Sequence, residues 1–515
     1  MTRATLLLAT SLTASLVGCA GWHAENADAE VADILAAGRA QEAELRSIQH
    51  PRPAEIAAVD SRFLGPETQR LTLAEALAIA VKNNRGYRSQ KETLYQEGLA
   101  LTQTRFDFGP RLSSTLSYIW SDDEFGVGVQ SASAGGTVSQ ILPTGGTASL
   151  SGSLSASYPE GRTDQSFGTS VSLDLDQPLL RGAGRAVSHE RLTQAERTLV
   201  YALRTFELFR QDFSIDLAQS YYDLVSQQQT LNNQVRTYDE AVYDRKKAEA
   251  LRQVDRNSDE QVFRARRREV VTQNGLINAR ARYKRALDEF KIQLGLPSAS
   301  NLDVSSLEPL YETVDFDPVS AVEAALRNRL DVATSRQQME DAERRAFLAE
   351  NGLLPQLDLS VNGSFSGSDQ RLQKAWADEW GFSGGLSLQL PLQLKRERNL
   401  YRNSLIRRDR ARRTYDLFRD RVGLEVRDQL RQLDSVEEQI VIQEAQIIQE
   451  RRAVTVTEIR YEAGLLDNRD LLEARQGLID AQNSLIRLKV DHFIRRLRLL
   501  RSLGLLEIDT QGRWK

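Results

Sequence analysis

The sequence predicts a mainly helical fold that also carries membrane-type β-strands, built from two copies of one helix-strand-helix unit. Three observations predict it. Apolar residues recur every seven positions through two long segments, apolar and hydroxylated residues alternate in several short segments, and both patterns return in the second half of the chain. A period of seven indicates paired helices, whereas a period of two indicates strands with one apolar and one polar face.

Composition narrows the class of protein. Of the 515 residues, 41% are hydrophobic and 27% are charged, and the formal net charge is −4. A mean hydropathy of −0.44 excludes a protein that crosses a membrane with many helices. No basic block outweighs its acidic neighbours, which argues against nucleic-acid binding, and the arginine-rich runs at 264–268 and 407–413 fit solvated helix faces.

The N-terminus is typical of a bacterial lipoprotein signal. An apolar run follows Arg3, is too short to span a membrane as a helix, and ends in L-V-G-C at Cys19. We expect a signal peptide over 1–18, lipid on Cys19, and a tether and arm over 19–68. The alternative is a cysteine that lies near a cleavage site by chance. Because Cys19 is the only cysteine, lipidation leaves no thiol for a disulfide.

Internal matches indicate a tandem duplication. Asn83 matches Asn328 and Pro110 matches Pro355, both at an offset of 245 residues. Farther on, T-F-E-L-F-R at 205–210 matches T-Y-D-L-F-R at an offset of 209 residues, so the first copy holds about 36 extra residues between its strands. We expect the first copy over 69–297, a linker over 298–317, the second copy over 318–506 and a tail over 507–515.

Each copy is expected to open with a helix and to continue, after its strands, into two long helices, the second of which returns along the first. Thr72 stands three residues before Glu75, which is a capping-box pattern, and Asp317 precedes Pro318, which favours a helix start. The first long helix after the strands has a length on the order of 100 Å, because its helical pattern runs for more than 60 residues. In the second copy its heptad positions are Val426, Leu433, Ile440, Ile447 and Val454. Heptads fit a wall of paired helices as well as an ordinary coiled coil.

A strand with two different faces is expected in the extra segment, at about 122–166. In T-A-S-L-S-G-S-L-S-A-S-Y, residues 147–158, every odd position is Ser or Thr and the even positions are apolar or glycine. The preceding I-L-P-T-G-G is typical of a tight turn. Similar alternation is present at 170–176 and at 357–365, so several strands face water on one side and an apolar medium on the other.

The chain resembles the TolC-type outer-membrane efflux protein family over roughly residues 70–506. The resemblance rests on the lipobox, the duplicated units, Q-P-L-L-R-G-A-G-R at 177–185, N-R-L-D-V at 328–332 and Y-E-A-G-L-L-D-N-R-D-L-L-E-A at 461–474. It implies a homotrimer whose strands close one barrel in the outer membrane and whose helices form a long periplasmic coiled-coil barrel. The implied function is the exit duct of a tripartite efflux or type I secretion system, with a periplasmic adaptor and an inner-membrane pump as partners and no cofactor.

Within that resemblance, the hydroxylated strand faces would line a water-filled pore and the apolar faces would meet lipid. The expected pore-lining residues are Ser151, Ser172, Asp174 and Ser360. Family members commonly supply four strands per chain. Two interpretations of the extra segment stay open: a further hairpin that crosses the membrane and widens the barrel, with six strands per chain, or a folded external loop.

The resemblance also implies a gate at the periplasmic tip. Asp470 and Glu473 share one helix face and match two acids that point into the closed entrance in the family. Candidates for polar contacts that hold the tip shut are Tyr461, Asp467 and Arg469. The family's lock includes a basic residue where this chain has Leu466, and the alternative for the two acids is an ordinary solvated helix start. The first copy offers Asp259 and Glu260, which we do not expect to reach the axis equally.

Catalytic chemistry has little support in the sequence. The four histidines make no metal-binding spacing, no phosphate-binding glycine loop with its lysine is present, and two methionines with one cysteine are too few for a soft-metal relay. We expect neither an enzyme nor a metal site. The alternative to a duct is a lipid-anchored periplasmic coiled-coil scaffold without a pore, and a hydrolase on the same frame has the least support.

The proposed anchor gives a first testable prediction. Cys19→Ser removes the thiol that would accept the lipid, so the chain should remain unprocessed or unacylated, as mass spectrometry of the N-terminus would show. Trimers should persist without the lipid, because the strands are a separate determinant of membrane insertion. An unmodified Cys19 in the mature wild-type protein would contradict the prediction.

Overall fold

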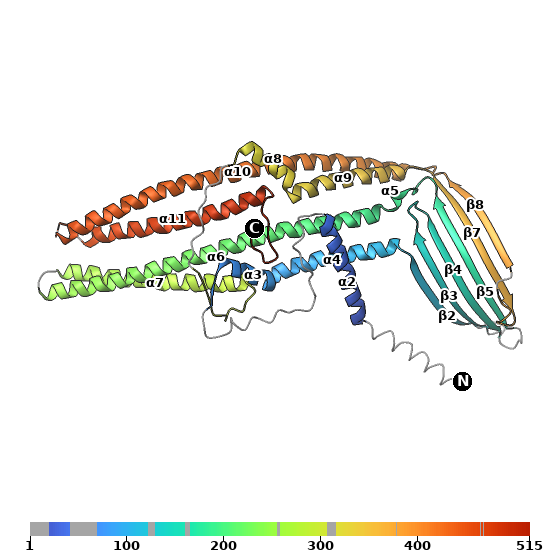
Figure 1. Ribbon diagram of the computed structural model, residues 1–515, viewed down its shortest axis with the longest axis horizontal. Coiled ribbons are helices and arrows are strands. Elements are labelled where there is room, and N and C mark those ends of the chain that lie inside the picture. Colours follow the sequence, from blue (N-terminus) through green and yellow to red (C-terminus); the bar gives the residue numbers. More distant parts are fainter. Residues whose placement is uncertain are drawn as a thin grey trace, which may run out of the picture. The chain divides into compact units, whose positions relative to one another are not determined.

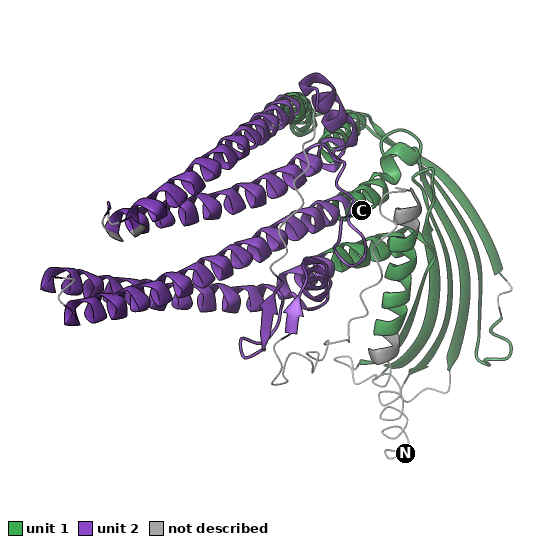
Figure 2. Cartoon of the chain, turned by 60° about the vertical axis from the view of Figure 1, so that its left-hand side comes forward, with its two compact units in different colours: residues 1–43, 94–203, 334–417 green, residues 44–93, 204–333, 418–515 purple. Residues whose placement is uncertain are grey.

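The computed structural model describes residues 20–41, 69–121, 129–159, 165–254, 258–305, 316–376, 379–463, 465–466 and 468–514. Cys19 and Asp467 lie outside the described residues. The chain divides into two compact units (Figure 2), unit 1 from residues 1–43, 94–203 and 334–417 and unit 2 from residues 44–93, 204–333 and 418–515. None of the described helices has a stretch long and apolar enough to span a membrane.

Unit 1 is organised around one antiparallel sheet of six strands (Figure 1). In spatial order these are β2 (Arg111–Ser121), β3 (Val129–Ile141), β4 (Thr147–Pro159), β5 (Ser166–Pro178), β7 (Gln356–Asp369) and β8 (Glu379–Gln389). The extra segment of the first copy forms the hairpin β3–β4, which is paired within the sheet between β2 and β5. The hairpin therefore adds two strands to the sheet and does not fold as a separate loop.

A tight turn joins β3 to β4 beside the entry into the long helix of the first copy. Gly145 has a φ of +98°, which residues with a side chain rarely adopt. A Cβ at Gly145 would collide with the carbonyl oxygen of Gly182, and the amide of Gly184 donates to the carbonyl oxygen of Thr144 at 2.8 Å. The turn thus lies at the end of the sheet where the helices attach.

Four helices of unit 1 lie side by side: α4 (Arg85–Phe108), α6 (Glu190–Gln253), α9 (Leu330–Asn351) and α10 (Lys395–Glu462). These four also contribute residues to unit 2. The other helices of unit 1 are α2 (Ala20–Gln41) and the short α5 (Arg185–Ser188). Helix α2 packs on α4. Arg105 pairs with Glu196 (3.2 Å) between α4 and α6, and Arg197 pairs with Asp341 (2.8 Å) between α6 and α9. Helix α9 then faces α10 across a groove.

Unit 2 contains two antiparallel helix pairs, in which α6 returns as α7 (Asp259–Gln293) and α10 returns as α11 (Asn468–Ser502). The shorter elements are α3 (Leu73–Asn83), α8 (Pro318–Asn328), and the parallel strands β1 (Gln69–Leu71) and β6 (Leu302–Val304). The predicted heptad positions Val426, Leu433 and Ile440 are at most 1% exposed. Their burial holds α10 in the core of this unit.

The two copies make the same turn at the end of their returning helices. Gly295 and Gly504 have φ values of +74° and +71°. A Cβ at Gly295 would lie 2.5 Å from the carbonyl carbon of Asn83, and a Cβ at Gly504 would lie 2.8 Å from that of Asn328. Both glycines therefore let the turn approach the junction at which the first helix of the copy ends.

Side chains at that junction repeat the same bond with different chemistry. In the first copy, the amide nitrogen of the Asn84 side chain donates to the carbonyl oxygen of Gln293 at 2.7 Å. In the second copy, the Arg329 guanidinium donates to the carbonyl oxygen of Ser502 at 3.4 Å and also pairs with Glu425 at 3.0 Å. The equivalent bonds show the duplication in three dimensions.

The C-terminal residues pack into unit 2. Ile508 is 4% exposed, and its carbonyl oxygen accepts a hydrogen bond from the buried Arg210 at 3.1 Å. The indole nitrogen of Trp514 donates to the hydroxyl of Ser214 at 3.3 Å. The segment expected as a tail over 507–515 is thus part of the core as far as the structure describes it, to residue 514.

Gly504→Ala should destabilise unit 2. A side chain at positive φ costs roughly 1–2 kcal/mol, and the added Cβ must also displace the backbone of Asn328. We expect a loss on the order of 1–3 kcal/mol, seen as a lower midpoint of thermal unfolding by circular dichroism.

Gly423→Ala is the matched control. Gly423 lies within α10, and a Cβ there would meet no atom closer than 3.6 Å. Because alanine is the better helix former, stability should hold or rise by up to about 1 kcal/mol. Equal losses for the two variants would show that the turn at Gly504 has no special role.

Candidate functional site

One face of the sheet carries rows of hydroxyl groups that run across the strands. The register places Ser151 of β4 opposite Ser172 of β5. The row consists of Ser113, Thr137, Ser151, Ser172, Ser364 and, on β8, Gly381, so five of its six positions carry a hydroxyl group. In the next row, the hydroxyls of Ser153 and Ser170 are 2.8 Å apart and share a hydrogen bond. Such cross-strand pairs stabilise the sheet while the face remains wettable.

All four residues predicted to line a pore lie on this polar face. Asp174 is two positions beyond Ser172, and Ser360 stands opposite Asp176, which is two positions farther on. Asn362 of β7, a polar residue of the alternating segment 357–365 that was not among the four expected pore-lining residues, donates a hydrogen bond from its side chain to Asp174. Its place in the alternation of β7 was the available signal.

The opposite face is apolar and exposed. Leu150 stands opposite Leu173, and the two side chains are 51% and 57% exposed. Aromatic residues gather on this face toward the strand ends that lie away from the helices: Tyr118, Trp120, Tyr158 and Trp380. An exposed apolar band with aromatic residues at its margin is unfavourable in water and typical of a strand surface in lipid.

The sheet is open at both edges. Strands β2 and β8 form these edges, have 11 residues each, and are exposed along most of their length. Among the described residues, no strand pairs with the outer side of either one. Unpaired edges of this length invite pairing with another chain, and in lipid they leave backbone groups without hydrogen bonds.

The tip of the second copy presents unpaired acids. Asp470 and Glu473 lie in the first turns of α11, are exposed, and make no ion pair with another described residue. Arg469 is also exposed. Tyr461 is half-buried and lies under Lys247 of α6, whose ammonium nitrogen is 5.5 Å from the centre of the ring. The sequence missed Lys247, because the contact joins residues of different copies.

The tip of the first copy differs in its electrostatics. Arg252 pairs with Asp259 at 2.6 Å across the turn, and Arg264 pairs with Glu260. The hydrogen bond from Arg252 and its positive charge lower the pKa of the Asp259 carboxyl. Both acids of this tip are therefore paired with arginines of their own hairpin, which distinguishes them from Asp470 and Glu473.

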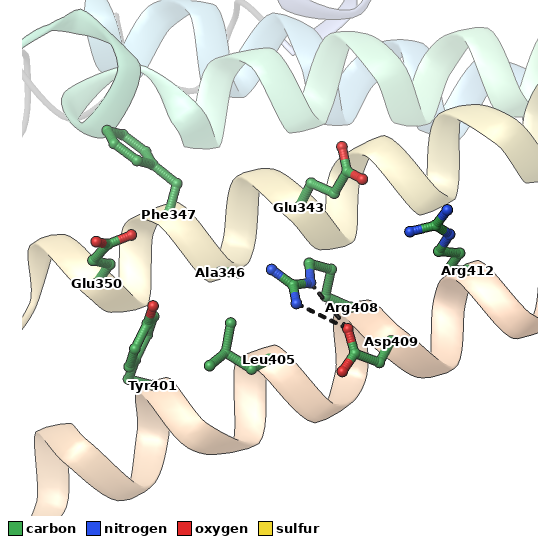
Figure 3. A pocket seen from close by; sticks show the side chains of 9 residues that line it. All are labelled: Glu343, Ala346, Phe347, Glu350, Tyr401, Leu405, Arg408, Asp409 and Arg412. Atoms are coloured by element: carbon green, nitrogen blue, oxygen red, sulfur yellow. Dashed lines mark hydrogen bonds and ion pairs between the residues drawn. The ribbon is translucent and has the colours of Figure 1, made fainter.

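The groove between α9 and α10 in unit 1 has a volume of 460 Å³ (Figure 3). Its lining includes Glu343 and Phe347 on α9 and Arg408 and Arg412 on α10, and Arg408 is paired with Asp409 at 3.0 Å. These side chains do not make a nucleophile and base pair. Across the described residues, no three His, Cys, Asp or Glu side chains are grouped to hold a metal ion.

The second copy matches the sequence model of a known protein family. Residues 321–505 match the family model of the outer membrane efflux proteins. The pyoverdine export outer membrane protein OpmQ of Pseudomonas aeruginosa is 25% identical over 183 residues. That match covers 35% of this chain and 37% of the relative, so it spans little more than a third of the relative's length.

Solved structures share the fold over most of the chain. The outer-membrane channel OprN superposes with a TM-score of 0.62 at 18% identity and covers 88% of this chain and 98% of its own. The CmeC outer membrane channel of Campylobacter jejuni gives a TM-score of 0.61 at 15% identity, over 89% and 94%. CusC gives 0.61 at 15% identity, over 89% and 99%. At these identities the likeness shows the fold alone.

The two faces of the sheet predict opposite responses to a charge. Leu173→Arg should cost about 2–4 kcal/mol if the residue lies near the membrane midplane, whereas Ser172→Arg, one position away on the polar face, should be tolerated. The measurement is the yield of folded protein in outer membranes and in detergent. Equal damage from both variants would contradict a lipid-facing and a water-facing side.

The same comparison tests the extra hairpin alone. Leu150→Arg should impair insertion and Ser151→Arg should not, because the two residues lie on opposite faces of β4. Tolerance of both variants would mean that β3 and β4 lie outside the membrane.

Proposed function

We propose that this chain, whose resemblance to the TolC-type outer-membrane efflux proteins is confirmed by the family match, is the outer-membrane exit duct of an export system. In this proposal three chains close one barrel across the outer membrane, and their helices continue the barrel as a tube into the periplasm. Cys19 anchors each copy through a lipid. The duct passes substrates to the exterior without chemical change, so no cofactor takes part.

The observation that carries the proposal is the open six-stranded sheet with one hydroxylated and one apolar face. Two edges without partners are incompatible with lipid, so closure requires more strands. Three copies supply eighteen strands, enough for a barrel with an aqueous lumen. With its polar face inward, such a barrel holds water, and with its apolar face outward it meets lipid.

The helices of unit 2 support association between copies. On α7, Phe263, Val270 and Ile277 follow each other at intervals of seven and are 57–66% exposed. On α10, Val441 and Ile448, also seven apart, are 65% and 50% exposed. Apolar heptad stripes left uncovered within one chain are typical of helices that pack against a neighbouring chain.

The proposed partners follow from the position of such a duct. A duct in the outer membrane needs an inner-membrane pump to supply its substrate and a periplasmic adaptor to join the two. The relative named for pyoverdine export makes a small molecule the first substrate class to test. Crosslinking in the native cell followed by co-purification would identify the pump and separate a tripartite efflux system from a type I secretion system.

A planar bilayer tests the pore directly. The purified full chain should form trimers and give discrete conductance steps, because the lumen is lined by hydroxyl groups. The competing hypothesis, a lipid-anchored periplasmic coiled-coil scaffold, allows no conductance. A protein that assembles but never conducts, even with its tip opened by mutation, would refute the duct.

The acidic tip predicts selectivity. We propose that three copies of Asp470 and Glu473 gather at the periplasmic mouth, with Tyr461, Asp467 and Arg469 supporting the closed state. Asp470→Ala with Glu473→Ala should largely abolish block by divalent cations from the periplasmic side and reduce cation preference in single-channel recordings.

The first copy provides the matched control for this pair. Asp259→Ala with Glu260→Ala removes two acids that are already paired with Arg252 and Arg264, so block and selectivity should stay near wild type. If both double variants behave alike, no special ring exists at the second tip.

A further inference from the structure

Helix α2 is held on α4 by a small apolar contact. Val31 and Leu35 are 0% and 2% exposed. Gly98 makes room for the contact, since a Cβ there would lie 2.8 Å from a methyl carbon of Val31. The hydroxyl of Tyr95 also donates a hydrogen bond to Asp28. The chain therefore fixes α2 on the helix that leads directly into the edge strand β2.

The outward side of α2 is acidic. Glu25, Glu30 and Asp33 are exposed, and none makes an ion pair with another residue that the structure describes. The buried positions Val31 and Leu35 occupy the opposite side, as the helical period requires. The apolar side of α2 is thus buried within the chain, whereas its charged side is exposed and makes no ion pair with another described residue.

The start of α10 has the opposite charge. Residues 395–413 contain nine Lys or Arg and two acidic residues. Four residues of this stretch, Tyr401, Leu405, Arg408 and Arg412, line the groove with α9 (Figure 3). A second set at the same helical spacing lies on another side of α10: Ile406, Arg410, Arg413 and Leu417.

This second side of α10 has no partner in the described part of the chain. Ile406 and Leu417 are 38% and 50% exposed. Arg410 and Arg413 are exposed and make no ion pair with another described residue. On this side two exposed arginines lie between two exposed apolar residues, an arrangement suited to another helix with acidic side chains.

The topology places the two features at opposite edges of unit 1. Helix α4, which carries α2, precedes the edge strand β2, and α10 follows the edge strand β8. Within one chain, α6 and α9 lie between α4 and α10. If β8 of one chain pairs with β2 of the neighbouring chain, α10 of the one chain comes next to the α2–α4 pair of its neighbour.

We propose that the acidic side of α2 packs on the arginine-rich start of α10 of the neighbouring chain and stabilises each interface between chains of the trimer. The occupant of this α10 surface is thus a second copy of the chain. The inference rests on the proposed trimer and adds a contact that strand pairing alone does not require. Single exposed ion pairs are weak, so the contact depends on several charges at each of the junctions.

Charge reversal tests the contact in the full-length protein. In detergent, the temperature at which the trimer dissociates is measured for wild type, for Glu25→Lys with Glu30→Lys and Asp33→Lys, and for Arg410→Glu with Arg413→Glu. Each reversal should lower that temperature, and the combination of both should restore most of the loss. High salt should reduce the differences, because it screens exposed charges.

A control set uses the other arginines of α10. Arg408→Glu with Arg412→Glu changes the side that faces α9, so adding the α2 reversal should not restore any loss it causes. Circular dichroism of each variant reports whether the helices are intact.

The outcomes separate this inference from the proposed function. Wild-type trimers that conduct, combined with an α2 reversal that leaves dissociation unchanged or a loss that the α10 reversal does not restore, would overturn the inference and leave the duct standing. If only the α10 reversal matters and its effect needs anionic lipid in reconstituted bilayers, the arginines bind lipid and the inference is wrong. Absence of wild-type trimers would instead refute the proposed function.

Discussion

The hydrogen-bonding demand of the strand backbone is the constraint on which the architecture depends. Each strand of the sheet is paired on both sides except β2 and β8, whose outer edges have no partner in the described chain. In lipid, water cannot form hydrogen bonds with those backbone groups, so a single chain placed in a membrane would leave them unpaired. In the barrel that we propose, closure by further chains would determine which helices meet, because α4 leads into one edge strand and α10 follows the other.

The extra hairpin satisfies the same constraint within the sheet. Strands β3 and β4 pair residue by residue with β2 and β5, and Ser151 and Leu150 keep to the faces of Ser172 and Leu173. A two-strand insertion preserves the antiparallel order, so it widens the sheet by two strands without reversing its faces. The hairpin adds no helix of its own, and its turn is bonded to the entry of α6 through Thr144 and Gly184. The barrel we propose is therefore wider than four strands per chain would build.

Duplication explains why the two repeats share their backbone arrangement, and sequence divergence between them explains why their side-chain contacts differ. Gly295 and Gly504 make equivalent turns, yet the residue at the adjoining junction is Asn84 in one copy and Arg329 in the other. At the tips, one hairpin pairs its own acids with arginines, whereas the other leaves Asp470 exposed. The same backbone thus carries one tip with internal charge balance and one whose acids are free to face an ion.

The sequence by itself determined the elements and their faces. Period-two segments predicted the polar face that holds Ser172, and the heptads predicted the burial of Leu433, because both patterns follow from local geometry. Only the tertiary structure decided the pairing of the extra hairpin within the sheet, the contact of Tyr461 with Lys247 and the packing of the C-terminal residues. These join residues far apart in the chain, and no local period carries information about such partners. The closed barrel that we propose would need the strands of several chains, so no pattern within one sequence determines how its edges pair.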